Sequence, residues 1–189
     1  MKRIAFALLA GALLMTASLS AAKDKDDKKH MDPYVTGPVD EAKMVREVRH
    51  QLVMLPYYSV FDDLGFTVNG GTVTLVGQVV RPVLKDDAAA VTKKVEGVTS
   101  VVNNIEVLPL SGNDDRIRRD VYRAIYGDPL LSTRYGFQAL PSIHIIVKNG
   151  NVRLEGVVAN EMDRSVANIR ANAVPGAFHV QNDLMIESK

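Results

Sequence analysis

One nine-residue pattern occurs twice in this chain, and its recurrence constrains the fold more than any other feature. The pattern of Gly71–Val79 returns at Gly150–Val158, 79 residues further along. The same spacing aligns later positions without a gap, namely Ala88 with Ala167, Val95 with Val174, Gly97 with Gly176, Val101 with Val180 and Asn103 with Asn182. So many matches in one register indicate a duplicated unit. We therefore predict two small domains, called here the first copy (residues 40–110) and the second copy (residues 111–189).

The chain begins with a segment typical of exported proteins. Residues 1–22 combine Lys2 and Arg3 with an apolar centre and the small residues Ser20-Ala21-Ala22, which predicts a signal peptide. Its apolar centre is shorter than the roughly 20 residues that span a bilayer. Residues 23–39 are rich in charge and contain prolines and a glycine, so we expect a flexible leader. Because the chain has no cysteine, we expect an exported protein without disulfides that is not a lipoprotein.

Periodicity predicts the elements of the first copy. A helix should start at an Asp40 N-cap, with its buried stripe formed by Val45, Val48, Leu52 and Leu55. Alternating residues predict strands at 65–68 and 72–79, joined by a tight turn at 69–71. A second helix should start at Pro82 and end at Gly97, with its buried positions at Leu84, Ala88, Val91 and Val95. A last strand at 98–108 completes the copy, interrupted in pattern at Asn103-Asn104.

The second copy repeats this order. Its first helix has a capping-box-like start at Ser111 and Asp114, and its predicted buried positions are Ile117, Val121, Ala124 and Ile125. Strands at 143–147 and 151–158, a helix at 162–173 and a strand at 178–186 follow, after a loop at 130–142 that is about six residues longer than its counterpart.

This order of elements predicts an α+β fold in each copy. The tight turn makes the first two strands antiparallel, and the helix that follows makes the second and third parallel. Each α-β-β-α-β copy should be a mixed three-stranded sheet with two helices on one face, in a strand order that the pattern leaves open. Gly77 and Gly156 interrupt a strand, which is typical of a close approach, and we expect a helix to pack across them.

The repeated residues resemble the BON domain. The resemblance rests on residues 68–77 and 149–156 and on the matched positions above, and it covers nearly all of residues 40–187. It departs at Ala177, where the pattern prefers valine, and at Arg170, which replaces the apolar Val91, so we expect the second helix of that copy to rotate and use Ile169. The resemblance implies a periplasmic, non-catalytic protein that binds phospholipid membranes and maintains the cell envelope under osmotic stress.

In lipid-binding relatives, the resemblance attributes membrane contact to the first helix of the second copy. Helical spacing turns arginines and tyrosines of that helix outward, and the following loop adds two more such residues. Tyrosine suits a membrane interface, and arginine pairs with phosphate. The hypothesis is a surface for anionic phospholipid made of Arg116, Arg119, Tyr122, Arg123, Tyr126, Arg134 and Tyr135.

An alternative remains open, in which the two helical tyrosines pack against the long loop or the other copy. The protein would then be a periplasmic protein-interaction or chaperone-like module that holds other envelope proteins without lipid contact.

Composition argues against enzymatic and nucleic-acid functions. The four histidines lie far apart without metal-ligand spacing, and no catalytic motif occurs, so we expect no enzyme activity, cofactor, metal site or small-molecule substrate. The first copy carries 7 basic and 9 acidic residues, and the second carries 10 and 9. Neither balance is typical of a nucleic-acid-binding protein.

Overall fold

The computed structural model describes residues 41–187. The predicted signal peptide at 1–22 and leader at 23–39 lie outside the described residues. The elements of the first copy are α1 (Glu41–Val53), β1 (Asp63–Asn69), β2 (Thr72–Val79), α2 (Pro82–Thr92), β3 (Ser100–Asn103) and β4 (Glu106–Val107). Those of the second copy are α3 (Gly112–Tyr126), α4 (Pro129–Tyr135), β5 (Ile143–Lys148), β6 (Asn151–Val158), α5 (Glu161–Asn172), β7 (His179–Asn182) and β8 (Met185–Ile186).

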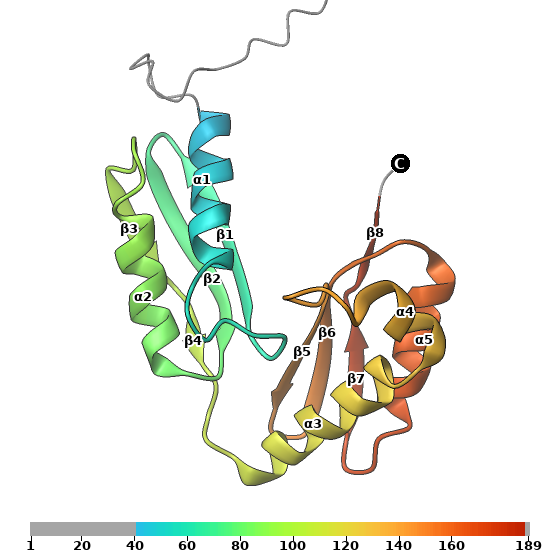
Figure 1. Cartoon of the computed structure of the whole chain (residues 1–189). Helices are drawn as coiled ribbons and strands as arrows, with labels where there is room; N and C mark the ends of the chain where they lie inside the picture. The colour runs from blue at the N-terminus through green and yellow to red at the C-terminus, as the bar shows by residue number, and fades with distance from the viewer. Residues whose placement is uncertain (1–40, 188–189) are drawn as a thin grey trace, which may run out of the picture. The chain divides into compact units, whose positions relative to one another are not determined.

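Each copy has one mixed sheet with its second strand at the centre (Figure 1). In the first copy, β2 pairs antiparallel with β1 and parallel with both β3 and β4. In the second copy, β6 has the same relation to β5, β7 and β8. The predicted mixed sheet is confirmed. Each predicted third strand is divided into two short strands, so each sheet has four.

A repeated asparagine explains where the third strand divides. The side-chain amide of Asn103 donates to the carbonyl of Lys85 on α2 (2.7 Å), and its side-chain oxygen accepts from the Ile105 N–H (3.2 Å). Asn182 makes the same two bonds, to the Arg164 carbonyl (3.0 Å) and from the Leu184 N–H (3.3 Å). The asparagine thus ties helix to strand where the ladder is interrupted, which accounts for its recurrence.

The core of the first copy lies between the two helices and one face of the sheet. Its buried members come from α1, β2 and α2 and include Met44, Val48, Leu52, Val73, Leu75, Val79, Leu84 and Ala88. Because the β2 residues of this core share one face of the strand, both helices cover that face, as predicted. The predicted stripe of α1 is wrong at one position, since Met44 is buried and Val45 only half-buried.

The second helix of the first copy is shorter than predicted. It ends at Thr92, not at Gly97, and the chain continues through hydrogen-bonded turns that bury Val95. Thr92 is fully buried where Val91 was expected, and Val91 is half-buried. Gly97 lies beyond these turns with φ +86°, in the left-handed region that favours glycine.

The expectation that a helix packs across Gly77 and Gly156 is wrong. Both residues have positive φ, at +121° and +117°. A Cβ at Gly77 would collide with the carbonyl oxygen of Asp63, and one at Gly156 with that of Ser142. The close approach is therefore made by the backbone beside the neighbouring antiparallel strand, and the glycine is required by both conformation and space.

The core of the second copy is built in the same way, with one added helix. Its fully buried residues include Ile117, Val121, Ile125, Ile143, Ile145, Leu154, Ala167 and Ala171. The unpredicted α4 lies in the long loop, where Asp128 caps its start by accepting from the Leu130 N–H (2.9 Å) and Pro129 occupies the first turn. It packs against both α3 and α5, and it adds the fully buried Leu131 to the core (Figure 1).

The predicted rotation of α5 does not occur. Ile169 is 63% exposed, whereas Ala167 and Ala171 are buried. Arg170 is accommodated at the surface because its guanidinium bonds the buried carboxylate of Asp128, with Nη2 2.7 Å from Oδ2. Within residues 41–187, no helix is both long enough and apolar enough to cross a bilayer.

Candidate functional site

Helix α3, on which most of the predicted site lies, is anchored at its N-terminus by polar contacts. The Ser111 hydroxyl caps it by accepting from the Asp114 N–H (3.2 Å). The Asp114 carboxylate is buried and accepts from the N–H groups of Asn149 (2.9 Å) and Gly150 (2.8 Å) in the β5–β6 turn. These bonds fix the helix against the sheet and thereby set which of its side chains face solvent.

Arg118 is buried, which the sequence pattern did not predict. It is 3% exposed, and its guanidinium donates to the carbonyl of Val147 (2.6 Å) and to Asp115 (2.5 Å). Its spacing from Val121 would have placed it beside the buried stripe, but its charge argued for exposure. Ala124, which was expected to be buried, is half-buried.

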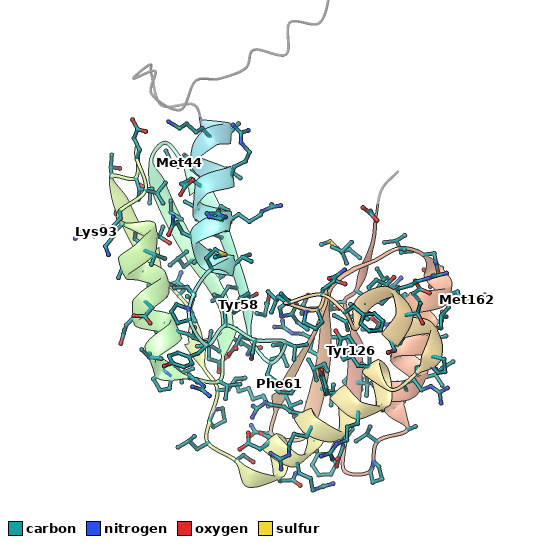
Figure 2. All side chains as sticks on the ribbon, in the orientation of Figure 1. Met44, Tyr58, Phe61, Lys93, Tyr126 and Met162 are labelled. Carbon is teal, nitrogen blue, oxygen red and sulfur yellow. The ribbon has the colours of Figure 1, made fainter. Side chains whose placement is uncertain are left out.

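The expectation that Tyr126 faces outward is wrong. It is 9% exposed, and it lies on the core side of α3 (Figure 2). Its hydroxyl donates to the Ile143 carbonyl (2.7 Å) and accepts from the N–H of the same residue (3.2 Å). Burial raises the pKa of Tyr126 well above its ordinary value. Its hydroxyl thus satisfies the start of β5, and it is not available to a membrane.

Tyr122 is the exposed aromatic residue of α3. It is 38% exposed, with its ring centroid 4.9 Å from that of Tyr126 and 6.0 Å from that of Phe61. Phe61 belongs to the loop between α1 and β1, whose Val60 carbonyl accepts from the Ile145 N–H (2.8 Å). The alternative was that the tyrosines pack against the long loop or the other copy. Tyr122 meets it in part, since its ring lies against Phe61 of the first copy, whereas Tyr126 packs into the core of its own copy against β5.

Three arginines on α3 form an exposed basic surface, called here the α3 arginine face: Arg116, Arg119 and Arg123. Asp120 pairs with two of them, at 3.4 Å to Arg116 and 3.2 Å to Arg123. Arg119 makes no ion pair within residues 41–187. One carboxylate among three guanidinium groups leaves this face positively charged.

Arg134 and Tyr135 lie apart from that face, on α4, and both bond the buried carboxylate of Asp163. Arg134 Nη1 lies 2.7 and 2.6 Å from the two carboxylate oxygens, and the Tyr135 hydroxyl donates to Oδ2 (2.5 Å). Hydrogen bonding to Asp163 raises the pKa of Arg134, and burial, with this carboxylate, raises that of Tyr135. Tyr135 is buried, whereas the Arg134 side chain is 43% exposed.

These positions divide the predicted set into two buried tyrosines, the exposed Arg134 on α4 and four residues on α3. Tyr126 and Tyr135 serve the core of the second copy, and Arg134 links α4 to α5. Arg116, Arg119, Tyr122 and Arg123 remain on the outer side of α3. Within residues 41–187, no group of histidine, aspartate and glutamate side chains is arranged to hold a metal ion.

The BON-domain family model matches the chain twice, at residues 40–109 and 113–188. The chain belongs to the BON domain family. These two matches correspond to the two copies seen in the fold, so the protein is a tandem BON-domain protein. BON domains are generally non-catalytic and are associated with the cell envelope and with membrane interactions.

Two solved structures of a Chlamydia trachomatis type III secretion protein, CdsD, are similar to the BON chain at low identity. The C-terminal domain of CdsD is 12% identical, with 79% of this chain and 100% of that chain covered and a TM-score of 0.28. A second CdsD structure is 14% identical, with 77% and 93% covered and a TM-score of 0.26. No curated protein matches the chain significantly.

Proposed function

We propose that this tandem BON-domain protein is exported to the periplasm and docks on anionic phospholipid surfaces through the second copy, helping to maintain the envelope under osmotic stress. The observation that carries the proposal is the α3 arginine face, with Tyr122 beside it. Arginine pairs bidentately with phosphate, and a tyrosine that is partly exposed offers an apolar ring and a wet hydroxyl. The exposed face of α1 contains Glu47 beside Arg46 and Arg49 and has no aromatic residue.

The alternative is a protein-interaction or chaperone-like module. It is favoured by the open face of the first sheet, where Val76 and Val102 are 41% and 42% exposed. Both point away from the core, because Leu75 and Val101 face it. Such a face suits an apolar surface of an envelope protein better than a charged headgroup.

Vesicle co-sedimentation of residues 23–189 distinguishes the two functions. Wild-type protein should sediment with phosphatidylglycerol-containing vesicles and not with neutral ones, and salt should weaken the interaction. Replacing Arg116→Gln and Arg123→Gln together should weaken it about thirtyfold, because each arginine near an anionic surface contributes about 1 kcal/mol. The matched control is Arg46→Gln with Arg49→Gln, which removes the same charge from α1.

Equal loss in both double variants would assign the binding to net charge and not to α3. If the folded wild type does not sediment with anionic vesicles at low salt, lipid docking is wrong and the protein-partner alternative takes its place.

A further inference from the structure

A cleft of about 380 Å³ lies where the loop after α1 meets α3. Three arginines line it, Arg81, Arg118 and Arg119, together with the aromatic residues Tyr57 and Phe61. A volume of this size accommodates a small ligand, such as a phosphate group with a few attached atoms.

Within residues 41–187, two of these arginines form no ion pair with a carboxylate. Seven arginines of residues 41–187 form ion pairs with carboxylates. Arg81 and Arg119 are not among them, although both line the same cleft. Unpaired guanidinium groups that converge on one cavity are suited to bind an anion bidentately.

The acidic residues of the cleft are already occupied. Asp62 accepts from the N–H and hydroxyl of Ser59 (3.0 and 2.7 Å) and from the Val80 N–H (2.7 Å). Asp115 accepts from Arg118. These carboxylates stabilise the walls, and two of them against three guanidinium groups leave the lining of the cleft a formal charge of +1.

Helix α2 adds to the positive potential, because it starts at this cleft. Arg81 is its N-cap residue and makes no side-chain hydrogen bond to the first turn. The N-terminus of a helix carries a partial positive charge that favours anions. Arg118 adds an unsatisfied donor, since its buried Nε has no hydrogen-bond partner within the described residues.

One wall is held in a strained conformation. Tyr57 has φ +69°, a value that is unusual for an aromatic residue, and it is 65% exposed. The guanidinium carbon of Arg81 lies 4.8 Å from the centroid of its ring. Backbone strain of this kind tends to occur at functional sites.

We propose that this cleft binds the phosphate group of a phosphate ester, with Arg81 and Arg119 as its direct ligands and the Tyr57 ring beside the organic part. The ester is either a free metabolite or the headgroup of a phospholipid. If the ester is a phospholipid headgroup, this site is part of the proposed membrane function and rests on it. If the ester is a free metabolite, the site does not depend on that function.

Isothermal titration of residues 23–189 with glycerol 3-phosphate tests the site directly. Saturable binding is expected, and Arg81→Gln should weaken it about tenfold, the effect of losing one charge-assisted contact. Arg46→Gln is the matched control, because Arg46 is also exposed and unpaired within the described residues but lies on α1. A melting curve of each variant establishes that it is folded.

Competition with vesicles identifies the source of the ester. Displacement of the protein from phosphatidylglycerol vesicles by glycerol 3-phosphate indicates a lipid headgroup, whereas binding without displacement indicates a free ester. The Arg116→Gln, Arg123→Gln variant should retain glycerol 3-phosphate binding even where vesicle binding is lost, which separates this site from the proposed docking surface. No saturable binding by folded wild type, or equal binding by Arg81→Gln, would overturn the proposal.

Discussion

The hydroxyl oxygen of Tyr135 lies 2.5 Å from Oδ2 of Asp163, and this bond joins α4 to the first turn of α5. The same hydroxyl accepts from the Ala159 N–H (2.8 Å) ahead of that helix. Asp163 is fully buried, so each donor to its carboxylate offsets part of the cost of removing a charge from water. The added helix of the second copy is therefore held by polar bonds as well as by its apolar residues.

Tyr135→Phe should lower the free energy of unfolding by about 1–2 kcal/mol, because it removes a hydrogen bond to a buried carboxylate and leaves the Ala159 N–H without its acceptor. Urea unfolding followed by circular dichroism measures the change. Tyr57→Phe is the control, since Tyr57 is largely exposed and its change should be within 0.5 kcal/mol or so. Equal effects in the two variants would show that the bond contributes nothing.

Tyr126→Phe should destabilise the protein by about 1–2 kcal/mol and leave vesicle binding unchanged, because its hydroxyl pairs with both backbone groups of Ile143. Tyr122→Phe should affect stability little, and Tyr122→Ala should weaken vesicle binding. The measurements are urea unfolding and vesicle co-sedimentation. Loss of vesicle binding in a folded Tyr126→Phe protein would contradict the core role assigned to this residue.

Gly77→Ala should destabilise the first copy by at least about 2 kcal/mol, since it forces a positive φ on alanine and a collision with Asp63. Gly156→Ala should act in the same way on the second copy. Gly112→Ala is a suitable control, because no atom lies within 4 Å of the added Cβ. Thermal melts compare the three variants, and a mild effect at Gly77 would mean that the neighbouring strand can shift.

Asp128→Asn should reduce stability at neutral pH but not in acid. Bonding to Arg170 lowers the pKa of Asp128 below its ordinary value of 3.8. The folded state therefore favours the charged form, and its contribution is present above that ordinary value and lost as the pH falls through the lower folded value. Asparagine still caps α4, so the substitution isolates the charge.

Melting temperatures of wild type and Asp128→Asn should differ at pH 7 and converge as the pH falls below 3.8 and through the lower folded pKa of Asp128. Asp86→Asn removes the same charge from an exposed position of α2 and should show no such convergence. A constant difference between wild type and Asp128→Asn at all pH values would mean that the ion pair with Arg170 does not set the stability.

The order of elements and the family were predictable from the sequence, because both depend on local patterns and on repetition. Alternation in residues 72–79 identifies a strand whichever way the chain folds, and the 79-residue spacing makes each copy evidence for the other. The centre of each sheet was not predictable, since strand order depends on which edges pair in space.

Orientation within the elements was decided by tertiary contacts. Helical spacing alone gives Tyr126 an outward position, but a hydrogen bond to Ile143 stabilises it in the core. Arg118 is charged and is nevertheless buried, because its guanidinium donates to the carbonyl of Val147. The repeat indicates that glycine is required at position 77 but does not give the reason. The reason is the carbonyl of Asp63, on another strand, with which a Cβ at this position would collide. Local patterns and repetition thus predict two BON copies and a basic first helix in the second copy. Which arginines of residues 41–187 form no ion pair, and that two of these line one cleft, follows only from the folded arrangement, because ion pairing depends on distances between residues far apart in the chain.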